Sequence, residues 1–447
     1  MGLVGFRKWL YFFLFGLRGI PLGTYYNRYV REDQQGIPPD TTKRLLIDLL
    51  THCSQNVPYY AKAISQIKGT IYNDPEEYLR HFPVLTKEII RSSFNELKST
   101  DLSKRKWFFN TSSGSTGEPA RFIQDWEYSA RSGAVKILFS KLVGREIGER
   151  EVRLWGSIHD IESNTEGWRA SLVNLIESTI FVNTVLMTPA RMHEYITTLN
   201  TSQPKLVLAY VEPLYEMAKY VESEGLCVVP PKAIITSAGK LFPFMREKIE
   251  KVFQCRVYDR YGSREVGDIA CERPDMDGLW VAPWGSYLEI VDPEGNRVPD
   301  GTEGEILATS LTNFAMPLIR YRIGDRGVLS PTPNRHSTKF GQVLSEVTGR
   351  SMDLFRTTNG ALFNPGYFMA KLYFRDWISQ FQIVQKSLSL VIYKIVVNTH
   401  PSQEELDEIA SLTRNALGTD CEVRFEFVDK IPATVSGKYR HIISEIQ

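Results

Sequence analysis

Apolar runs that alternate with helical patterns constrain the fold of this 447-residue chain more than any other feature. The strand-like runs and the helical segments between them occupy residues 152–155, 206–210, 212–224, 233–236, 243–253 and 256–258. Strands separated by helices form parallel sheets, because the crossover helix returns the chain to the same edge of the sheet. The sequence therefore predicts an α/β fold built on parallel strands.

The flanking segments predict further units. Residues 41–97 have helical spacing of leucines, and the short alternating runs at 287–291 and 304–310 predict a β-rich subdomain. Beyond a boundary near 349–353, two strands within 380–396, an amphipathic helix and a last strand predict a small α+β domain. That helix covers residues 402–417, begins at a possible Ser cap and precedes a strand at 421–428.

Composition excludes several classes of protein. With 53 Lys and Arg against 52 Asp and Glu, the chain has no basic excess, so we expect no nucleic-acid partner. Its five cysteines are scattered, without a Cys-x-x-Cys pair, and this pattern fits a reducing cytoplasm. Cys271 beside Glu272 is either a metal-site remnant or a buried inert thiol.

The N-terminus is unusually apolar. Arg7 and Lys8 precede the run WLYFFLF at 9–15, Arg18 follows it, and no acid occurs before Glu32. A bilayer-spanning helix needs about 20 apolar residues, so this run is too short. Two interpretations stay open: a helix packed on the protein, or peripheral membrane contact through residues 1–20.

Residues 111–119 (TSSGSTGEP) form a loop suited to approach phosphate. Glycines let a ligand come close to the backbone, while hydroxyl and backbone N–H groups donate to phosphoryl oxygens. A flexible surface linker has a similar composition. No Gly-Lys-Ser/Thr follows at the required spacing, so the P-loop NTPases are disfavoured.

The order of this loop and several other motifs resembles that of the adenylate-forming enzymes, the acyl-CoA synthetase superfamily. The nearest resemblance is to the phenylacetate–CoA ligase branch, which includes the CapK-like proteins encoded with capsular-polysaccharide genes. The motifs span nearly the whole chain and lie at residues 56–60, 82–87, 111–119, 261–265, 304–306, 317–325, 349–350 and 436–438.

The resemblance implies a large N-terminal adenylation domain at 1–350, with parallel sheets and a β-rich subdomain, and a small mobile lid domain at 351–447. The implied cofactors are ATP and Mg²⁺, with coenzyme A as the acceptor. The phosphate loop would hold the triphosphate through Ser113, Gly114, Ser115, Thr116 and Gly117.

The other roles implied by the resemblance surround the nucleotide. Glu265 would hold Mg²⁺, which prefers oxygen ligands. Lys438 would bridge the attacking carboxylate and the α-phosphate. The remaining nucleotide contacts would come from the ribose ligands Asp325 and Arg350, from Tyr261, Gly262 and Asp259 near the adenine, and from Ser237, Ala238 and Gly239 on its other side.

The acid itself is not named by the sequence. Trp155, His159 and Tyr210 follow predicted strands and are candidates for the acyl pocket, and an alternative for His159 is a structural hydrogen bond. We expect a cytoplasmic monomer or homodimer that activates a small carboxylic acid and transfers it to coenzyme A. Two alternatives stay open: transfer of an acyl, aminoacyl or nucleotidyl group to another acceptor in surface-polysaccharide synthesis, and a non-catalytic assembly protein.

Overall fold

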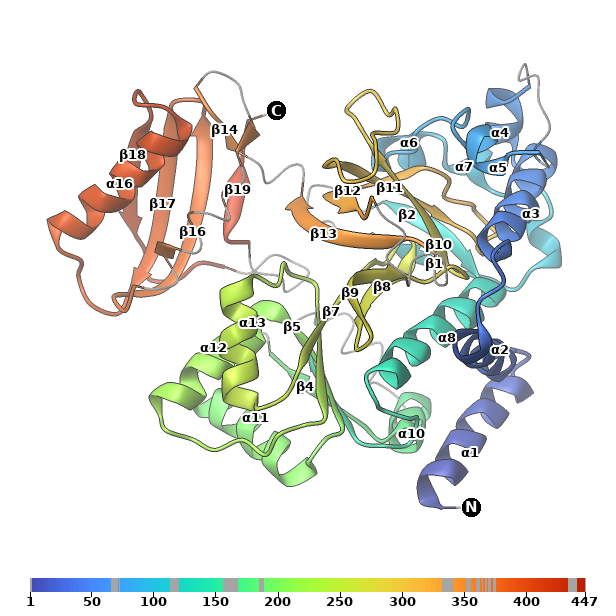
Figure 1. Cartoon of the computed structure of the whole chain (residues 1–447), viewed down its shortest axis with the longest axis horizontal. Helices are drawn as coiled ribbons and strands as arrows, with labels where there is room; N and C mark the ends of the chain where they lie inside the picture. Colours follow the sequence, from blue (N-terminus) through green and yellow to red (C-terminus); the bar gives the residue numbers. More distant parts are fainter. Residues whose placement is uncertain are drawn as a thin grey trace. The chain divides into compact units, whose positions relative to one another are not determined.

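A computed structural model gives the fold, and the chain divides into two compact units, Met1–Thr348 and Gly349–Gln447 (Figure 1). The sequence-based boundary near 349–353 lies at this division. The residues that the structure describes are 2–65, 71, 73–112, 120–155, 168–184, 189–331, 341–350, 355–358, 362–363, 365, 368, 371–372, 375–432 and 440–446.

The first unit opens with helices, as the leucine spacing predicts. In α3 the side chains of Leu46, Leu49, Leu50 and Cys53 are fully buried, because they recur on one face of the helix. The helical elements are α1 (Leu3–Leu17), α2 (Leu22–Gln35), α3 (Thr41–Asn56), α4 (Pro58–Ala63), α5 (Pro75–Leu79), α6 (Lys87–Ser92), α7 (Phe94–Leu97) and the 3-10 turn η1 (Leu102–Lys104).

Five parallel strands form one half of the large sheet, in the order β4-β3-β5-β6-β7. Helices α11, α12 and α13 lie beside these strands in Figure 1. The α/β class predicted from the alternating pattern is confirmed. The elements are α8 (Trp126–Leu142), β3 (Glu151–Trp155), α10 (Trp168–Glu177), β4 (Thr179–Asn183), α11 (Pro189–Ser202), β5 (Leu206–Tyr210), α12 (Val211–Ser223), β6 (Ala233–Ser237), α13 (Pro243–Phe253) and β7 (Val257–Ser263).

The antiparallel strands continue the same sheet instead of forming a separate layer. They begin at Gly267, earlier than the expected start near Tyr287, because β7 pairs with β8 directly after a tight turn. The full order of the eleven strands is β10-β11-β12-β13-β9-β8-β7-β6-β5-β3-β4. The added strands are β8 (Gly267–Arg273), β9 (Met276–Val281), β10 (Ser286–Val291), β11 (Gly304–Ser310), β12 (Tyr321–Leu329) and β13 (Val343–Arg350).

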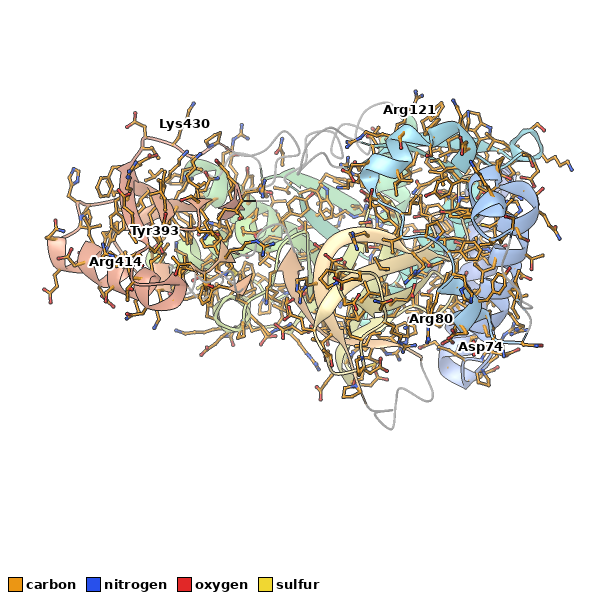
Figure 2. All side chains as sticks on the ribbon, turned by 90° about the horizontal axis from the view of Figure 1, so that it is seen from above. Asp74, Arg80, Arg121, Tyr393, Arg414 and Lys430 are labelled. Carbon is orange, nitrogen blue, oxygen red and sulfur yellow. The ribbon has the colours of Figure 1, made fainter. Side chains whose placement is uncertain are left out.

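The second unit has a four-stranded sheet in the order β18-β17-β16-β19 and the helix α16. Ser402 and Glu405 form a reciprocal capping box at the start of α16, as the sequence suggests. Tyr393, labelled in Figure 2, bonds Thr413 of α16 at 2.6 Å and ties the sheet to the helix. The elements are β14 (Phe355–Arg356), β15 (Leu362–Phe363), β16 (Ile378–Ser387), β17 (Leu390–Val397), α16 (Gln403–Leu417), β18 (Glu422–Phe427) and β19 (Ile442–Ser444).

Candidate active site

Predicted site residues line the carboxyl ends of the parallel strands. Tyr210 pairs with Ser237 across β5 and β6, and Thr236 pairs with Asp259 across β6 and β7. Trp155 ends β3, and its ring lies 4.5 Å from that of Tyr210. This edge of an open α/β sheet is where such folds bind ligands, so the strand order itself brings these residues together.

The surroundings of Asp259 disfavour the charged form of its carboxylate. Its Oδ1 accepts hydrogen bonds from the Thr236 hydroxyl at 3.2 Å and from the Arg260 backbone N–H at 3.0 Å. Burial, reinforced by the nearby Glu272 carboxylate, raises the pKa of Asp259 to about 6. Asp259 is therefore a charged hydrogen-bond acceptor only above about pH 6.

The turn after β6 lies very close to the Glu212 side chain. Ala238 has a left-handed backbone with φ of 69°, which non-glycine residues rarely adopt. A Cβ on Gly239 would lie only 2.4 Å from the Glu212 carboxylate, so only glycine fits there without moving Glu212. The predicted segment Ser237, Ala238 and Gly239 thus forms a strained turn packed on the start of α12.

Strands β7 and β12 are joined at the predicted ribose site. The Tyr261 hydroxyl donates a 2.9 Å hydrogen bond to Asp325 Oδ2. A Cβ on Gly262 would lie 2.5 Å from the Gly267 carbonyl oxygen, so the turn that follows Tyr261 requires glycine. Residues 321–325 of the predicted motif belong to strand β12 and reach the site from that strand.

Glu265 is buried and lies beside the same strand. Tyr321 donates its hydroxyl to Glu265 Oε1 at 3.1 Å, and Lys87 Nζ lies 4.0 Å from that oxygen. Burial, with the Glu265 carboxylate next in importance, keeps the pKa of Tyr321 far above its usual range. Tyr321 therefore remains a hydrogen-bond donor, and both of these described contacts reach the same oxygen of Glu265.

Sequence reasoning gave no role to Lys87, although it recognised the motif at 82–87. The structure explains the position of this lysine. Leu85 forms a parallel bridge with Tyr321. Its N–H donates to the Arg320 carbonyl oxygen at 3.1 Å, and its carbonyl oxygen accepts from the Arg322 N–H at 2.9 Å. Thr86 then caps α6, so Lys87 begins that helix close to Glu265.

The hairpin of β1 (Trp107–Thr111) and β2 (Arg121–Asp125) carries the predicted phosphate loop. Two hydrogen bonds join Ser112 and Ala120 at the base of the loop. The Ala120 N–H donates to the Ser112 hydroxyl at 2.8 Å, and the Ser112 N–H donates to the Ala120 carbonyl oxygen at 2.9 Å. Gln124 on β2 donates to the carbonyl oxygen of Arg264 at 3.0 Å and reaches that of Glu265 at 3.4 Å. The base of the loop is thus tied to the backbone at Glu265.

Two further motifs are structural. Tyr60 donates to the Pro317 carbonyl oxygen at 3.0 Å and accepts from the Ile319 N–H at 3.2 Å, which joins the 56–60 motif to the segment before β12. Arg320 is buried and pairs with Glu289 at 3.1 Å. Its guanidinium also donates to three backbone carbonyl oxygens, so it anchors loops and does not face a ligand.

Comparisons with known proteins agree with this geometry. Residues 355–445 match the family model described as the CapK C-terminal domain. Protein CapK of Staphylococcus aureus is 24% identical over 90% of this chain and 88% of its own length. A phenylacetate-coenzyme A ligase of Aromatoleum evansii is 26% identical over 68% of each chain. The chain is a homologue of CapK and of the phenylacetate–CoA ligases.

Solved structures extend the likeness of fold. A 2-hydroxyisobutyryl-CoA ligase in the postadenylation state, in complex with R3-HIB-AMP, has a TM-score of 0.69 and 18% identity, over 90% of this chain and 89% of that one. The predicted resemblance to CapK and the phenylacetate–CoA ligases and the predicted fold are therefore confirmed. The acid and the acceptor of this CapK homologue are a separate question.

The donor set near Glu265 suits magnesium better than a transition metal. Cys271 is buried, burial raises the pKa of its thiol, and the described residues hold no cluster of three His, Cys, Asp or Glu side chains. Mg²⁺ commonly binds one or two carboxylates together with substrate phosphates, and does not need a cage of protein ligands. The buried carboxylate of Glu265 fits that pattern.

Several predicted site residues fall outside the described residues: the loop members Ser113, Gly114, Ser115, Thr116 and Gly117, together with His159 and Lys438. The backbone of Arg350 ends β13, but its side chain is not described. Lys240, which follows the predicted segment 237–239, pairs with Glu346 at 3.2 Å and so has a structural partner.

Proposed function

We propose that this chain activates a small carboxylic acid with MgATP as an acyl-adenylate, releases pyrophosphate and transfers the acyl group to coenzyme A. The observation that carries the proposal is that Tyr261 on β7 and Glu265 in the turn after it bond Asp325 and Tyr321 on β12. A non-catalytic assembly protein would have no physical need for the buried carboxylate of Glu265 beside Asp325, the predicted ribose ligand.

The residues divide the electrostatic work of adenylation. Two anions must meet when a carboxylate attacks the α-phosphate, so cations and donors have to offset their repulsion. Glu265 would hold Mg²⁺, which would neutralise phosphate charge when bound. Lys87, 4.0 Å from Glu265, would add a positive charge on the side of α6. Lys438 would bring a mobile ammonium from the second unit.

The nucleoside would be held by the strand ends. Asp325 would accept hydrogen bonds from the ribose hydroxyls while Tyr261 keeps its carboxylate oriented through the 2.9 Å bond. Asp259 would accept from the adenine amino group, and Ser237, Ala238 and Gly239 would line the other side of the base. Trp155 and Tyr210, whose ring centroids lie 4.5 Å apart, would form an apolar wall of the acyl pocket.

A different acceptor is the second candidate function. The match to CapK covers 90% of this chain, more than the 68% covered by the phenylacetate–CoA ligase of Aromatoleum evansii, and the second unit matches the CapK C-terminal domain. The longer match to CapK is the reason to keep a second acceptor under test, and the acceptor that the motifs imply besides coenzyme A is a component of surface-polysaccharide synthesis. Both candidates share the adenylation step and differ only in the acceptor of the activated group.

The test measures acid-dependent pyrophosphate release with MgATP over a panel of aryl, fatty and amino acids, with and without coenzyme A. Turnover that requires coenzyme A supports the ligase. Adenylate formation indifferent to coenzyme A supports another acceptor. Lys438→Ala should abolish pyrophosphate release and leave ATP binding largely intact, and unchanged release in that variant would refute the role assigned to Lys438.

A further inference from the structure

Helix α1 presents an entirely apolar face to solvent. Within Leu3–Leu17 every exposed residue is apolar or glycine, and Leu3, Trp9 and Leu17 are 66%, 51% and 69% exposed. Apart from Val4, which lies on the same side as Arg7 and Lys8, the exposed set recurs at helical spacing and forms one stripe. Its large members are Leu3, Phe6, Trp9, Phe13 and Leu17.

The charged residues of this helix point toward the protein instead. Lys8 pairs with Glu146 at 2.8 Å and lies 3.4 Å from the Tyr26 hydroxyl. Arg7 donates to the Gly148 carbonyl oxygen at 3.3 Å. These contacts fix the rotation of α1 on the first unit, so the outward direction of the stripe is a property of the folded chain.

A neighbouring helix widens the apolar surface. Helix α10 packs beside α1 in the first unit (Figure 1) and exposes Leu172 and Leu175 by 41% and 65%. Single exposed apolar side chains are ordinary, but several large ones on one face of a helix mark an interaction surface. We call this surface the α1–α10 patch: the five stripe residues of α1 (Leu3, Phe6, Trp9, Phe13 and Leu17) together with Leu172 and Leu175.

We propose that the α1–α10 patch lies flat on an anionic lipid surface. Trp9 stacks on Phe6 and Phe13, with ring centroids 6.1 and 5.1 Å apart, and such aromatic side chains favour the membrane interface. The patch is a protruding helix face, which suits a bilayer surface. Among the described residues no helix is long and apolar enough to span a membrane, so the contact is peripheral.

Charge favours lipid headgroups over a second copy of the chain. Two cations lie at the C-terminal end of α1. Arg18, which is exposed, directly follows the helix. The ammonium of Lys106 lies next to Gly19, 3.8 Å from the position that a Cβ on that glycine would take. The first acid in the sequence is Glu32. A self-contact along α1 would offer these cations no acidic partner from residues 1–31, whereas an anionic leaflet attracts each of them.

The test is flotation of the full chain with vesicles of phosphatidylcholine, alone or with roughly one-third phosphatidylglycerol. We expect flotation with the anionic vesicles, weakened by high salt, and a loss of about tenfold or more in the triple variant Phe6→Ser, Trp9→Ser, Phe13→Ser. The matched control, Val229→Ser, Leu388→Ser, Phe427→Ser, removes three similarly exposed apolar side chains elsewhere and should float like the parent.

A single-charge variant keeps the proposal falsifiable if the triple variant fails to fold. Arg18→Glu leaves the apolar stripe intact and should lower flotation with anionic vesicles about tenfold. Absence of flotation with either vesicle would overturn the proposal, as would equal flotation of the parent and the folded triple variant. Dimers in solution that the triple variant converts to monomers, without vesicle binding, would assign the patch to a second copy instead.

Discussion

The hydroxyl of Tyr261 lies 2.9 Å from Asp325 Oδ2, so two strands that are not neighbours in the sheet meet at one carboxylate. If Asp325 binds the ribose, Tyr261 orients the carboxylate that accepts from the ribose hydroxyls. Tyr261→Phe removes one hydrogen bond to a charged group, worth about 1.5 kcal/mol, and should raise the KM for ATP about tenfold. The KM for the acid should stay unchanged.

Asp325→Asn provides the comparison for that variant. It keeps the shape of the side chain but weakens acceptance from two ribose hydroxyls, so its effect on the KM for ATP should exceed that of Tyr261→Phe. A Tyr261→Phe enzyme with the parent's KM for ATP would show that the Tyr261–Asp325 bond only fastens β7 to β12.

Lys87 and Glu265 should move the magnesium requirement in opposite directions. Glu265→Gln removes the charge that attracts Mg²⁺, so half-maximal pyrophosphate release should need at least about tenfold more Mg²⁺. Lys87→Met removes a cation 4.0 Å from the same oxygen, and the Mg²⁺ concentration for half-maximal rate should fall several-fold. Magnesium titrations at saturating ATP measure both. A rise in that concentration for Lys87→Met would contradict the arrangement.

The sequence predicted the elements whose pattern is local. The strand at 206–210 and the helix at 243–253 match β5 and α13 residue for residue, because apolar runs and flanking turns define both ends. The Ser402 cap is likewise local. Continuity of the eleven-stranded sheet was missed, since the pairing of β7 with β8 depends on contacts that no single segment encodes.

In the candidate site, too, local motifs could be recognised from the sequence whereas long-range contacts could not. Motif order predicted roles for Glu265, Tyr261 and Asp325, and the hydrogen-bond partners of these residues come from segments far away in the sequence. Tyr321 meets Glu265 across 56 residues, and Lys87 arrives through the bridge of Leu85 to β12. Sequence spacing carries no signal for such pairs. The presence of Lys87 inside a recognised motif was the only available hint.

The pKa of Asp259 predicts a pH dependence of stability. In the folded chain it is raised to about 6 from its ordinary value of 3.8, so the fold favours the protonated carboxyl. Stability from this group is complete below about pH 4 and declines as the pH rises to about 6, by about 3 kcal/mol at most. Asp259→Asn should therefore raise the melting temperature at pH 7.5 and have little effect at pH 4. An equal shift at both pH values would contradict the raised pKa.

The same carboxyl should govern the pH profile of ATP binding. Charged Asp259 is the better acceptor for an adenine amino group, so the KM for ATP should rise as the pH falls below about 6. In Asp259→Asn the amide oxygen still accepts, and the KM should be flat over this range. Profiles measured by pyrophosphate release between about pH 5 and 8 compare the two, and a parent profile as flat as that of the variant would remove Asp259 from the adenine site.

Gly239 and Glu212 should behave as a coupled pair. Gly239→Ala places a methyl group 2.4 Å from the Glu212 carboxylate, the end of a flexible side chain that must then move, so the cost should lie near the lower end of the about 1–3 kcal/mol typical of overpacking. We expect a lower melting temperature and a higher KM for ATP, because the turn at 237–239 would shift. Glu212→Ala removes the carboxylate that the new methyl group would meet. In the Glu212→Ala background, adding Gly239→Ala should therefore change the melting temperature and the KM for ATP much less than it does in the parent. Additive losses in the double variant would mean that Gly239 is required for a reason other than the approach of Glu212.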